Sequence, residues 1–164
     1  MTGRRIRDVD KSGENRRMIH ASALLVGSAG VLLRGPSGSG KSSSTRELIA
    51  RAGGERLFAR LIGDDRVELV NRHGRLVARP HPKIAGAIEE RGVGILPMPY
   101  EPAGVIRCVV DLSGQGAPAP QRYPLDEPAE TELCGVALPR LRVDAFETGA
   151  ARKIFSFIHE FVAF

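Results

Sequence analysis

A glycine-rich stretch near residue 40 has the spacing of a phosphate-binding loop, G-x-x-x-x-G-K-[ST]. Glycines let the backbone curl so that successive N–H groups can point at phosphate oxygens, and a following helix adds the positive end of its dipole. In this pattern the lysine reaches the β- and γ-phosphates, and the serine hydroxyl binds Mg²⁺. The stretch consists of Gly35, Pro36, Ser37, Gly38, Ser39, Gly40, Lys41 and Ser42. We expect it to bind ATP or a similar polyphosphate.

Such a loop identifies a ligand and not a reaction, so the reacting groups must lie elsewhere in the chain. Asp64 and Asp65 follow an apolar stretch, residues 57–62. A carboxylate at a strand end near the loop can bind Mg²⁺ or accept a hydroxyl proton, although paired aspartates also form ordinary turns. His20 opens the apolar stretch before the loop, and residues 89–96 combine charged side chains with two glycines. Taken singly, each of these features also has a purely structural explanation.

The elements that must position these residues are mostly short strands. Two apolar runs around a glycine-containing turn predict strands over 19–26 and 31–34, directly before the loop. Helix-forming residues predict a helix over 41–52, which a pair of glycines ends. Further strands are predicted over residues 57–62, 67–70, 76–78, 104–112, 133–138 and 141–143, the second and third of them joined as a hairpin.

Helices are predicted to be few. Prolines between residues 80 and 102 exclude a long helix there, although residues 84–90 could form a turn or two. Apolar residues at helical spacing predict an amphipathic helix over 150–164, whose apolar stripe faces the core or another subunit. Strands outnumber helices, and a wholly parallel sheet would need more crossover helices. The predicted fold class is therefore α/β with a mixed, largely antiparallel sheet.

Composition is that of one ordinary globular domain: 164 residues, 42% hydrophobic and 26% charged. No apolar run approaches the roughly 18 residues that span a bilayer, and no apolar leader is present. We therefore expect a cytoplasmic protein with no membrane partner, and its two cysteines, Cys108 and Cys134, to be free buried thiols.

Of the net charge of +5, +3 lies in residues 1–17, which we interpret as a disordered basic arm before a domain over 18–164. Acidic residues interrupt this arm and no aromatic residue is interleaved, so we expect no nucleic-acid partner.

Taken in order, these pieces resemble the catalytic domain of the bacterial HPr kinase/phosphorylase family, from residue 18 to about residue 158. The segments that carry the resemblance are His20 with the strand after it, the phosphate loop, G-D-D-R-V at 63–67, R-P-H-P at 79–82, E-x-R-G-x-G-I at 89–95, L-P-R-L at 138–141 and Arg152. The resemblance implies a P-loop kinase core of the kind seen in phosphoenolpyruvate carboxykinase. This co-linear set is far more specific than any one of its parts.

The resemblance also implies a reaction. Members of the family use ATP and Mg²⁺ to phosphorylate a serine of the phosphocarrier protein HPr, which regulates the phosphotransferase system and carbohydrate metabolism. Some members use pyrophosphate, and many reverse the reaction with phosphate. The family commonly forms hexamers, so a homo-oligomer is expected here.

Residue roles follow from the same resemblance. It implies that Asp65 accepts the serine proton, that His20 beside it tunes this carboxylate, and that Asp64 supports the site. Lys41 would neutralise charge on the transferring phosphoryl group, and Ser42 and Glu89 would bind Mg²⁺. Arg91 and Arg152 would contact phosphate oxygens or position the substrate. Such roles suit phosphoryl transfer, in which positioning and charge neutralisation dominate.

The chain also departs from the family pattern. It lacks the family's N-terminal domain and its C-terminal segment, has a longer connection between Lys41 and Asp65, and carries Glu90 and Lys153 where the family usually has an apolar residue and an asparagine. Kinase activity is therefore better supported than phosphorylase activity. Two alternatives stay open: a P-loop kinase of a small molecule, and a nucleotide-dependent sensor without catalysis.

Overall fold

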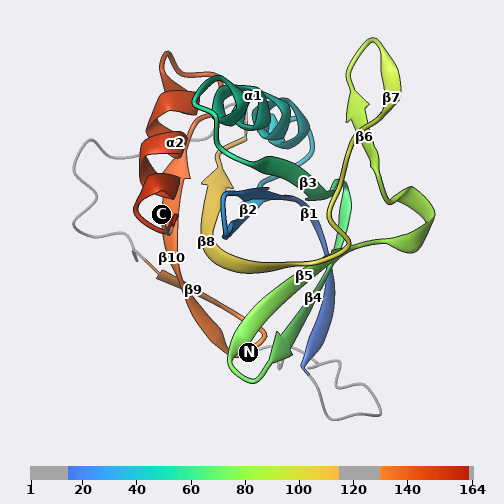
Figure 1. Cartoon of the computed structure of the whole chain (residues 1–164), viewed down its shortest axis with the longest axis vertical. Coiled ribbons are helices and arrows are strands. Elements are labelled where there is room, and N and C mark those ends of the chain that lie inside the picture. The colour runs from blue at the N-terminus through green and yellow to red at the C-terminus, as the bar shows by residue number, and fades with distance from the viewer. Residues whose placement is uncertain (1–14, 115–129, 163–164) are drawn as a thin grey trace, which may run out of the picture.

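The computed structural model describes residues 15–114 and 130–162, and most of the arm predicted over 1–17 lies outside these ranges (Figure 1). The elements in chain order are β1 (Arg16–Val26), β2 (Ala29–Arg34), α1 (Lys41–Gly54), β3 (Ala59–Gly63), β4 (Arg66–Arg72), β5 (Arg75–Pro80), a short 3₁₀ helix (Pro82–Ile84), β6 (Ala87–Glu90), β7 (Gly94–Pro97), β8 (Gly104–Leu112), β9 (Glu130–Leu133), β10 (Val136–Val143) and α2 (Ala150–His159).

Five strands close into a ring. β2, β1, β4, β5 and β8 pair antiparallel in that order, and a parallel pairing of β8 with β2 closes the circle. β10 continues the sheet parallel to β8, β9 lies antiparallel to β10, and β3 pairs with β1. β6 and β7 form a separate two-stranded sheet that projects from the body (Figure 1). The predicted fold class, α/β with a mixed and largely antiparallel sheet, is confirmed.

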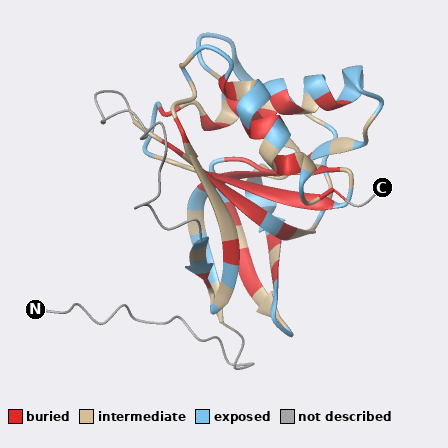
Figure 2. Ribbon diagram, turned by 90° about the vertical axis from the view of Figure 1, so that its left-hand side faces the viewer, coloured by how far each residue is buried: buried red, intermediate tan, exposed pale blue. Residues whose placement is uncertain are grey.

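The core lies on both sides of the central strands. Along β2 the side chains alternate: Val31 and Leu33 pack in a cluster with the two helices, whereas Leu32 packs in a second cluster inside the ring. All three are fully buried, which is why β2 is apolar at successive positions. Figure 2 shows the same pattern, with red buried strands at the centre and the helices' exposed faces outside. The loop that follows β2 is thus held on the most deeply buried strand.

Two predicted helical segments are shorter than expected. Residues 84–90 form no helical turns: the 3₁₀ helix ends at Ile84, and residues 87–90 are strand β6. Their backbone groups pair instead with those of β7, across the turn at residues 91–93. α2 ends at His159 and not at residue 164, because the N–H groups of Glu160 and Phe161 close the last turn with bonds to residues three positions back.

Two of the differences in strand boundaries move residues between elements. Arg16 and Arg17, which we assigned to the arm, are the first residues of β1 and lie opposite Val70 and Leu69 of β4. The single strand predicted over 133–138 is broken by a turn at Cys134, whose φ of 50° is left-handed. Cys134 is consequently half-buried rather than buried, although both cysteines are free as expected.

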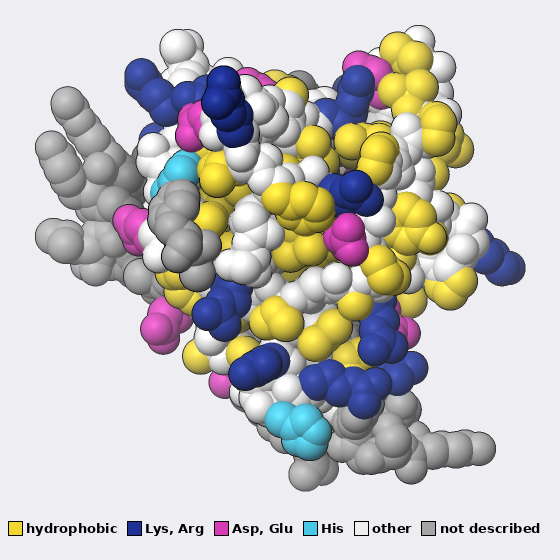
Figure 3. All heavy atoms as spheres, in the orientation of Figure 1, with side chains coloured by type: hydrophobic (Ala, Val, Ile, Leu, Met, Phe, Trp, Pro, Cys, Tyr) yellow, Lys and Arg dark blue, Asp and Glu magenta, His cyan; other side chains and the backbone are white. Residues whose placement is uncertain are grey.

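Basic side chains are not confined to the arm. Arg72 and Arg75 lie opposite each other at the end of the β4–β5 hairpin. On the face shown in Figure 3, dark blue Lys and Arg side chains gather at the lower end, where Figure 1 places this hairpin.

Within the described ranges, no helix has the length and apolar character needed to span a membrane.

Candidate active site

The predicted phosphate loop joins the end of β2 to the start of α1. Gly38 and Gly40 have φ angles of 80° and 92°, in the left-handed region that glycine enters without strain. Space is also limited, because a Cβ on Gly40 would lie 3.0 Å from the Cβ of Ala145. The glycines of the pattern are therefore required by the loop's conformation as well as by a ligand.

Lys41 begins α1 and is 7% exposed. Its Nζ donates hydrogen bonds to the carbonyl oxygens of Gly35 and Pro36, at 2.8 and 3.0 Å. Burial lowers the pKa of the Lys41 ammonium, and the nearby carboxylates of Asp64 and Asp65 oppose that shift. The Lys41 ammonium thus binds carbonyl oxygens of its own loop. An anionic phosphate at the same place would be a stronger hydrogen-bond partner than these neutral groups.

Asp64 lies in the turn between β3 and β4 and is 4% exposed. The hydroxyl of Ser42 donates to its carboxylate at 2.9 Å, the hydroxyl of Ser22 also donates to it, and the backbone N–H of Glu89 donates at 3.3 Å. Within the described residues Asp64 has hydrogen-bond donors but no ion-pair partner. A buried carboxylate satisfied only by neutral donors leaves its charge available to a cation.

Asp65, one residue later, faces a different environment. Its φ of 66° is left-handed, and the N–H of Arg66 closes the turn onto the carbonyl of Asp64 at 2.8 Å. Aspartate tolerates this backbone conformation better than most residues do. The turn directs the Asp65 carboxylate towards β1, where one oxygen lies 2.9 Å from Nε2 of His20. Both side chains are more than half exposed, so they are open to an incoming substrate.

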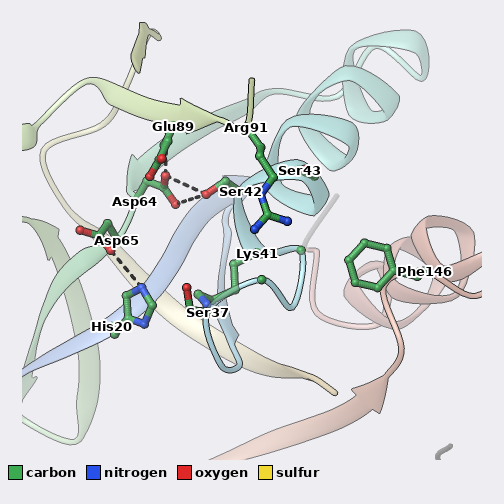
Figure 4. Close-up of a pocket in the computed structure, with 12 residues that line it drawn as sticks. His20, Ser37, Lys41, Ser42, Ser43, Asp64, Asp65, Glu89, Arg91 and Phe146 are labelled. Carbon is green, nitrogen blue, oxygen red and sulfur yellow. Dashed lines mark hydrogen bonds and ion pairs between the residues drawn. The ribbon is translucent and has the colours of Figure 1, made fainter. Parts of the chain in front are cut away.

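These groups line one cavity of about 290 Å³ (Figure 4). The phosphate loop and the start of α1 form one wall, the β3–β4 turn and β1 a second, and the β6–β7 sheet with the loop after β10 the rest. Its lining residues are His20, Ser37, Gly38, Gly40, Lys41, Ser42, Ser43, Asp64, Asp65, Glu89, Arg91 and Phe146.

The oxygen donors for a divalent cation gather at one point of this cavity. Ser42, Asp64 and Glu89 come from three different elements and lie together in Figure 4. The described ranges contain no group of three or more His, Cys, Asp or Glu side chains arranged as a metal cage. Mg²⁺ is typically bound by one or two carboxylates together with substrate phosphates, and the Ser42 hydroxyl with the carboxylates of Asp64 and Glu89 fits that ion.

The structure brings most of the predicted site residues together, with four exceptions. Gly35, Pro36 and Ser39 do not line the cavity, although the first two supply the carbonyls that hold Lys41. Arg152 lies on the exposed side of α2 and outside the cavity. Arg91, by contrast, reaches the cavity from the turn between β6 and β7 (Figure 4).

Sequence reasoning missed Ser22 and Phe146. Ser22 is fully buried in β1, and a polar residue inside an otherwise apolar strand was a readable signal that it has a partner. Phe146 lines the cavity from a loop 106 positions after Gly40, and nothing local in the sequence distinguishes it from a core aromatic.

A second missed feature is an ion-pair cluster below the loop. Arg34, the last residue of β2, lies opposite Asp111 of β8 and binds both carboxylate oxygens, at 2.7 and 2.8 Å. Arg140 of β10 approaches the same carboxylate at 3.5 Å, and Arg34 also donates to the hydroxyl of Thr131. The cluster joins three parallel neighbouring strands at the point where the phosphate loop begins. Asp111 is thereby part of a structural ion pair, and the carboxylates of the cavity come from the β3–β4 turn and from Glu89 of β6.

Comparison with known proteins agrees with this geometry. The family model described as HPr Serine kinase C-terminal domain matches residues 13–100, just over half of the chain. The HPr kinase/phosphorylase of Mycoplasma mycoides subsp. mycoides is 41% identical over 76 residues, covering 46% of this chain and 22% of that protein. The enzyme of Latilactobacillus sakei is 36% identical over 100 residues, covering 60% and 30%. The chain thus spans less than a third of the length of either relative.

A solved structure of the Hpr(Ser) kinase/phosphatase from Coxiella burnetii shares the fold, with a TM-score of 0.69 and 21% sequence identity. The superposition covers 88% of this chain and 90% of that one, so it extends well beyond the segment that the family model matches. Together with the phosphate loop, the paired aspartates and the histidine beside them, these matches show that the chain belongs to the HPr Serine kinase C-terminal domain family.

Proposed function

We propose that this protein is a kinase that transfers the γ-phosphoryl group of ATP to a serine hydroxyl of the phosphocarrier protein HPr, with Mg²⁺ as cofactor. One observation carries the proposal: the Asp65–His20 pair and Lys41 of the phosphate loop line the same cavity. A kinase needs a proton acceptor on one side of the transferring group and a phosphate clamp on the other.

Asp65 is the proposed base. In the forward reaction the serine oxygen forms a bond to the γ-phosphorus, the bond from that phosphorus to the bridging oxygen breaks, and ADP leaves. The serine proton passes to the Asp65 carboxylate. His20 lies 2.9 Å from that carboxylate and fixes its direction, which makes the histidine a positioning residue.

The remaining residues clamp and neutralise the phosphates. Lys41 exchanges its two carbonyl partners for phosphate oxygens, and the N–H groups of the loop add to the positive field. Ser42, Asp64 and Glu89 hold the Mg²⁺ ion, which lowers the charge repulsion on the phosphate group. Arg91 reaches the cavity and stabilises the negative charge on the oxygens of the transferring phosphoryl group. Arg152, outside the cavity, serves to position the protein substrate.

The proposal extends to the surroundings of the reaction. The catalytic unit begins with β1 at Arg16 and acts in the cytoplasm, where HPr and ATP both occur, as a homo-oligomer. Run in reverse with phosphate as acceptor, the same groups would return HPr to its free serine and release pyrophosphate. Control of HPr in this way regulates sugar uptake and carbon metabolism.

A direct assay tests the proposal. Purified HPr is incubated with the protein, ATP and Mg²⁺, and incorporated phosphate is located by mass spectrometry, with wild type compared with Asp65→Asn. We expect a phosphoserine on HPr with the wild type and at least a roughly 100-fold lower rate with the variant, the usual value of a general base. Glu101→Gln serves as control, because Glu101 pairs with Arg60 and does not line the cavity.

Each other result has a definite meaning. If HPr gains no phosphate from the wild type, the proposed substrate is wrong, and a screen of small hydroxyl compounds tests a small-molecule kinase. If no compound is phosphorylated while ATP still binds, the protein is a nucleotide-dependent sensor. If wild type and Asp65→Asn phosphorylate HPr equally, Asp65 is not the base.

A further inference from the structure

The loop after β10, residues 144–149, lies beside the phosphate loop. β2, β8 and β10 are parallel neighbours, so their carboxyl ends meet at one edge of the sheet. The closeness is measurable, since a Cβ on Gly40 would lie 3.0 Å from the Cβ of Ala145 and 3.6 Å from Cζ of Phe146.

The loop after β10 has a defined shape that presents one aromatic ring. The N–H of Phe146 donates to the Asp144 carboxylate at 2.9 Å, and the N–H of Glu147 donates to the Asp144 carbonyl at 3.2 Å. Glu147 in turn forms an ion pair with Lys153 of α2. With its backbone held in this way, the Phe146 side chain is still 62% exposed and lines the cavity.

The cavity therefore has two chemically different ends. In Figure 4, His20 and Asp65 lie on one side of the phosphate loop and Phe146 on the other. The first end carries a carboxylate and an imidazole, which suit an acceptor hydroxyl. At the second end the ring of Phe146 stands directly beside the loop, and a phosphate chain held by Lys41 would continue there into whatever group it carries.

We propose that Phe146 is the stacking platform for the nucleobase of the phosphate donor, and that it makes the protein prefer a nucleoside triphosphate to a polyphosphate without a base. The inference rests on the proposed function only in taking a polyphosphate to be the ligand of the loop. An aromatic face stacks on any nucleobase, whereas a donor without a base gains nothing from it. A single exposed phenylalanine is ordinary on a protein surface. Here the ring lines the same cavity as the phosphate loop and lies beside Gly40, and this position assigns it a ligand.

Binding measurements without HPr test the inference. Dissociation constants of Mg-ATP and of Mg-tripolyphosphate are measured by calorimetry for wild type, Phe146→Ala, Phe146→Tyr and the control Phe58→Ala. Phe58 is 49% exposed and does not line the cavity. We expect Phe146→Ala to weaken ATP about tenfold and to leave tripolyphosphate within about twofold of wild type. Phe146→Tyr and Phe58→Ala should bind both ligands as the wild type does.

Two results would overturn the inference. Unchanged ATP affinity in Phe146→Ala would show that no base stacks on the ring. Equal loss of ATP and tripolyphosphate would show that Phe146 supports the phosphate loop and does not contact a base. A Phe146-dependent preference for ATP in a protein that leaves HPr unmodified would support this inference and contradict the proposed acceptor, so the two failures are distinguishable.

Discussion

Asp64 and Asp65 are neighbours in the sequence, yet their side chains have opposite surroundings. Asp64 is 4% exposed and accepts hydrogen bonds from two serine hydroxyls and one backbone N–H, whereas 60% of the Asp65 side chain is exposed beside His20. The left-handed φ of Asp65 produces this division, since it turns the second carboxylate away from the first. One residue is thereby suited to holding a cation and the other to accepting a proton.

The His20–Asp65 contact leads to a prediction about relative effects. His20→Gln should lower kcat for HPr phosphorylation about tenfold, and less than Asp65→Asn does, because the histidine orients the base but contacts no proposed reacting atom. KM for ATP should stay within about twofold, since the proposed partner of His20 is Asp65 and not a phosphate group. Steady-state kinetics at saturating HPr measure both values. A loss as large as that of Asp65→Asn would identify His20 as the base instead.

The two thiols should differ in reactivity. Burial raises the pKa of Cys108 to about 12, and burial also raises the pKa of Cys134, although Arg17 opposes the second shift. The thiolate is the reactive form, so at pH 8 a thiol reagent should modify half-buried Cys134 and spare Cys108 until urea unfolds the protein. Two thiols that react rapidly in the folded protein would contradict the described burial.

Two pH effects follow from the same pKa shifts. Because the folded-state pKa of Cys108 is raised from 9.0 to about 12, its contribution to stability is complete below pH 9 and is lost as the pH rises towards 12.

Arg17→Gln should raise the pKa of Cys134 further and slow its modification at pH 8, with Arg60→Gln as the control. Unfolding free energies across the alkaline range and alkylation rates measure the two effects.

Between elements, the important junction joins the end of β2 to β8 and β10. β2 ends where the phosphate loop begins, and its last residue, Arg34, binds both oxygens of Asp111 on β8 while Arg140 approaches from β10. We call the ion pair of Arg34 with both oxygens of Asp111 the fork. Its two side chains are each about one quarter exposed, so solvent screens the interaction less than it would at the surface. This fork fixes the strand end from which the loop must curl.

Breaking the fork should therefore affect both stability and ATP binding. Arg34→Met leaves Asp111 with the more distant Arg140 alone, and we expect a loss of about 2 kcal/mol in unfolding free energy. KM for ATP should rise more than kcat falls, because the loop is displaced and the base is not. Urea denaturation and steady-state kinetics provide the two measurements.

A double variant separates charge from packing. Arg34→Met with Asp111→Leu should recover most of the lost stability, since it removes the carboxylate that has lost its closer cation. It should not restore the affinity for ATP if the fork positions the loop. A double variant as unstable as Arg34→Met alone would show that the loss comes from packing.

At the scale of the molecule, the fold is a ring of five strands with the two helices packed on one side. The candidate active site lies where the strand ends and the connecting loops meet. Both helices belong to one buried cluster with β2 and β8, while the second cluster fills the ring. α2 contributes Ile154, Phe155 and Ile158 to the first cluster, and all three are at most 3% exposed. The C-terminal helix is thus part of the platform that supports the phosphate loop.

Truncating this helix face should destabilise the whole domain. Ile158 is fully buried, so Ile158→Ala should lower the unfolding free energy by about 3 kcal/mol, through lost burial and the cavity it leaves. Ser156→Ala, on the exposed side of the same helix, should change it by less than about 0.5 kcal/mol. Urea titrations followed by circular dichroism test both values. Equal stability of the two variants would show that α2 does not pack as described.

The sequence alone determined what depends on neighbouring residues. The eight residues from Gly35 to Ser42 specify a phosphate loop because its conformation follows from local backbone freedom and from the helix that begins at Lys41. The strand before it and the α/β class follow from apolar runs, and the fold and family bear these predictions out. Local signals failed where two states were nearly balanced, as in residues 84–90, whose strand forms only because β7 pairs with it.

Tertiary structure decided which distant residues meet. Ser22 and Asp64 are 42 positions apart, and Arg34 and Asp111 are 77 apart, yet each pair is in direct contact. The antiparallel pairing of β1 with β3 and β4 brings the first pair together, and the parallel pairing of β2 with β8, which closes the ring, brings the second. No short-range pattern encodes these pairings. The same closure places β10 and the Phe146 loop beside Gly40 and leaves Arg152 outside the cavity. The sequence therefore predicted a phosphate-binding loop, because the conformation of that loop is local, whereas the surroundings of the loop depend on contacts that only the folded chain makes.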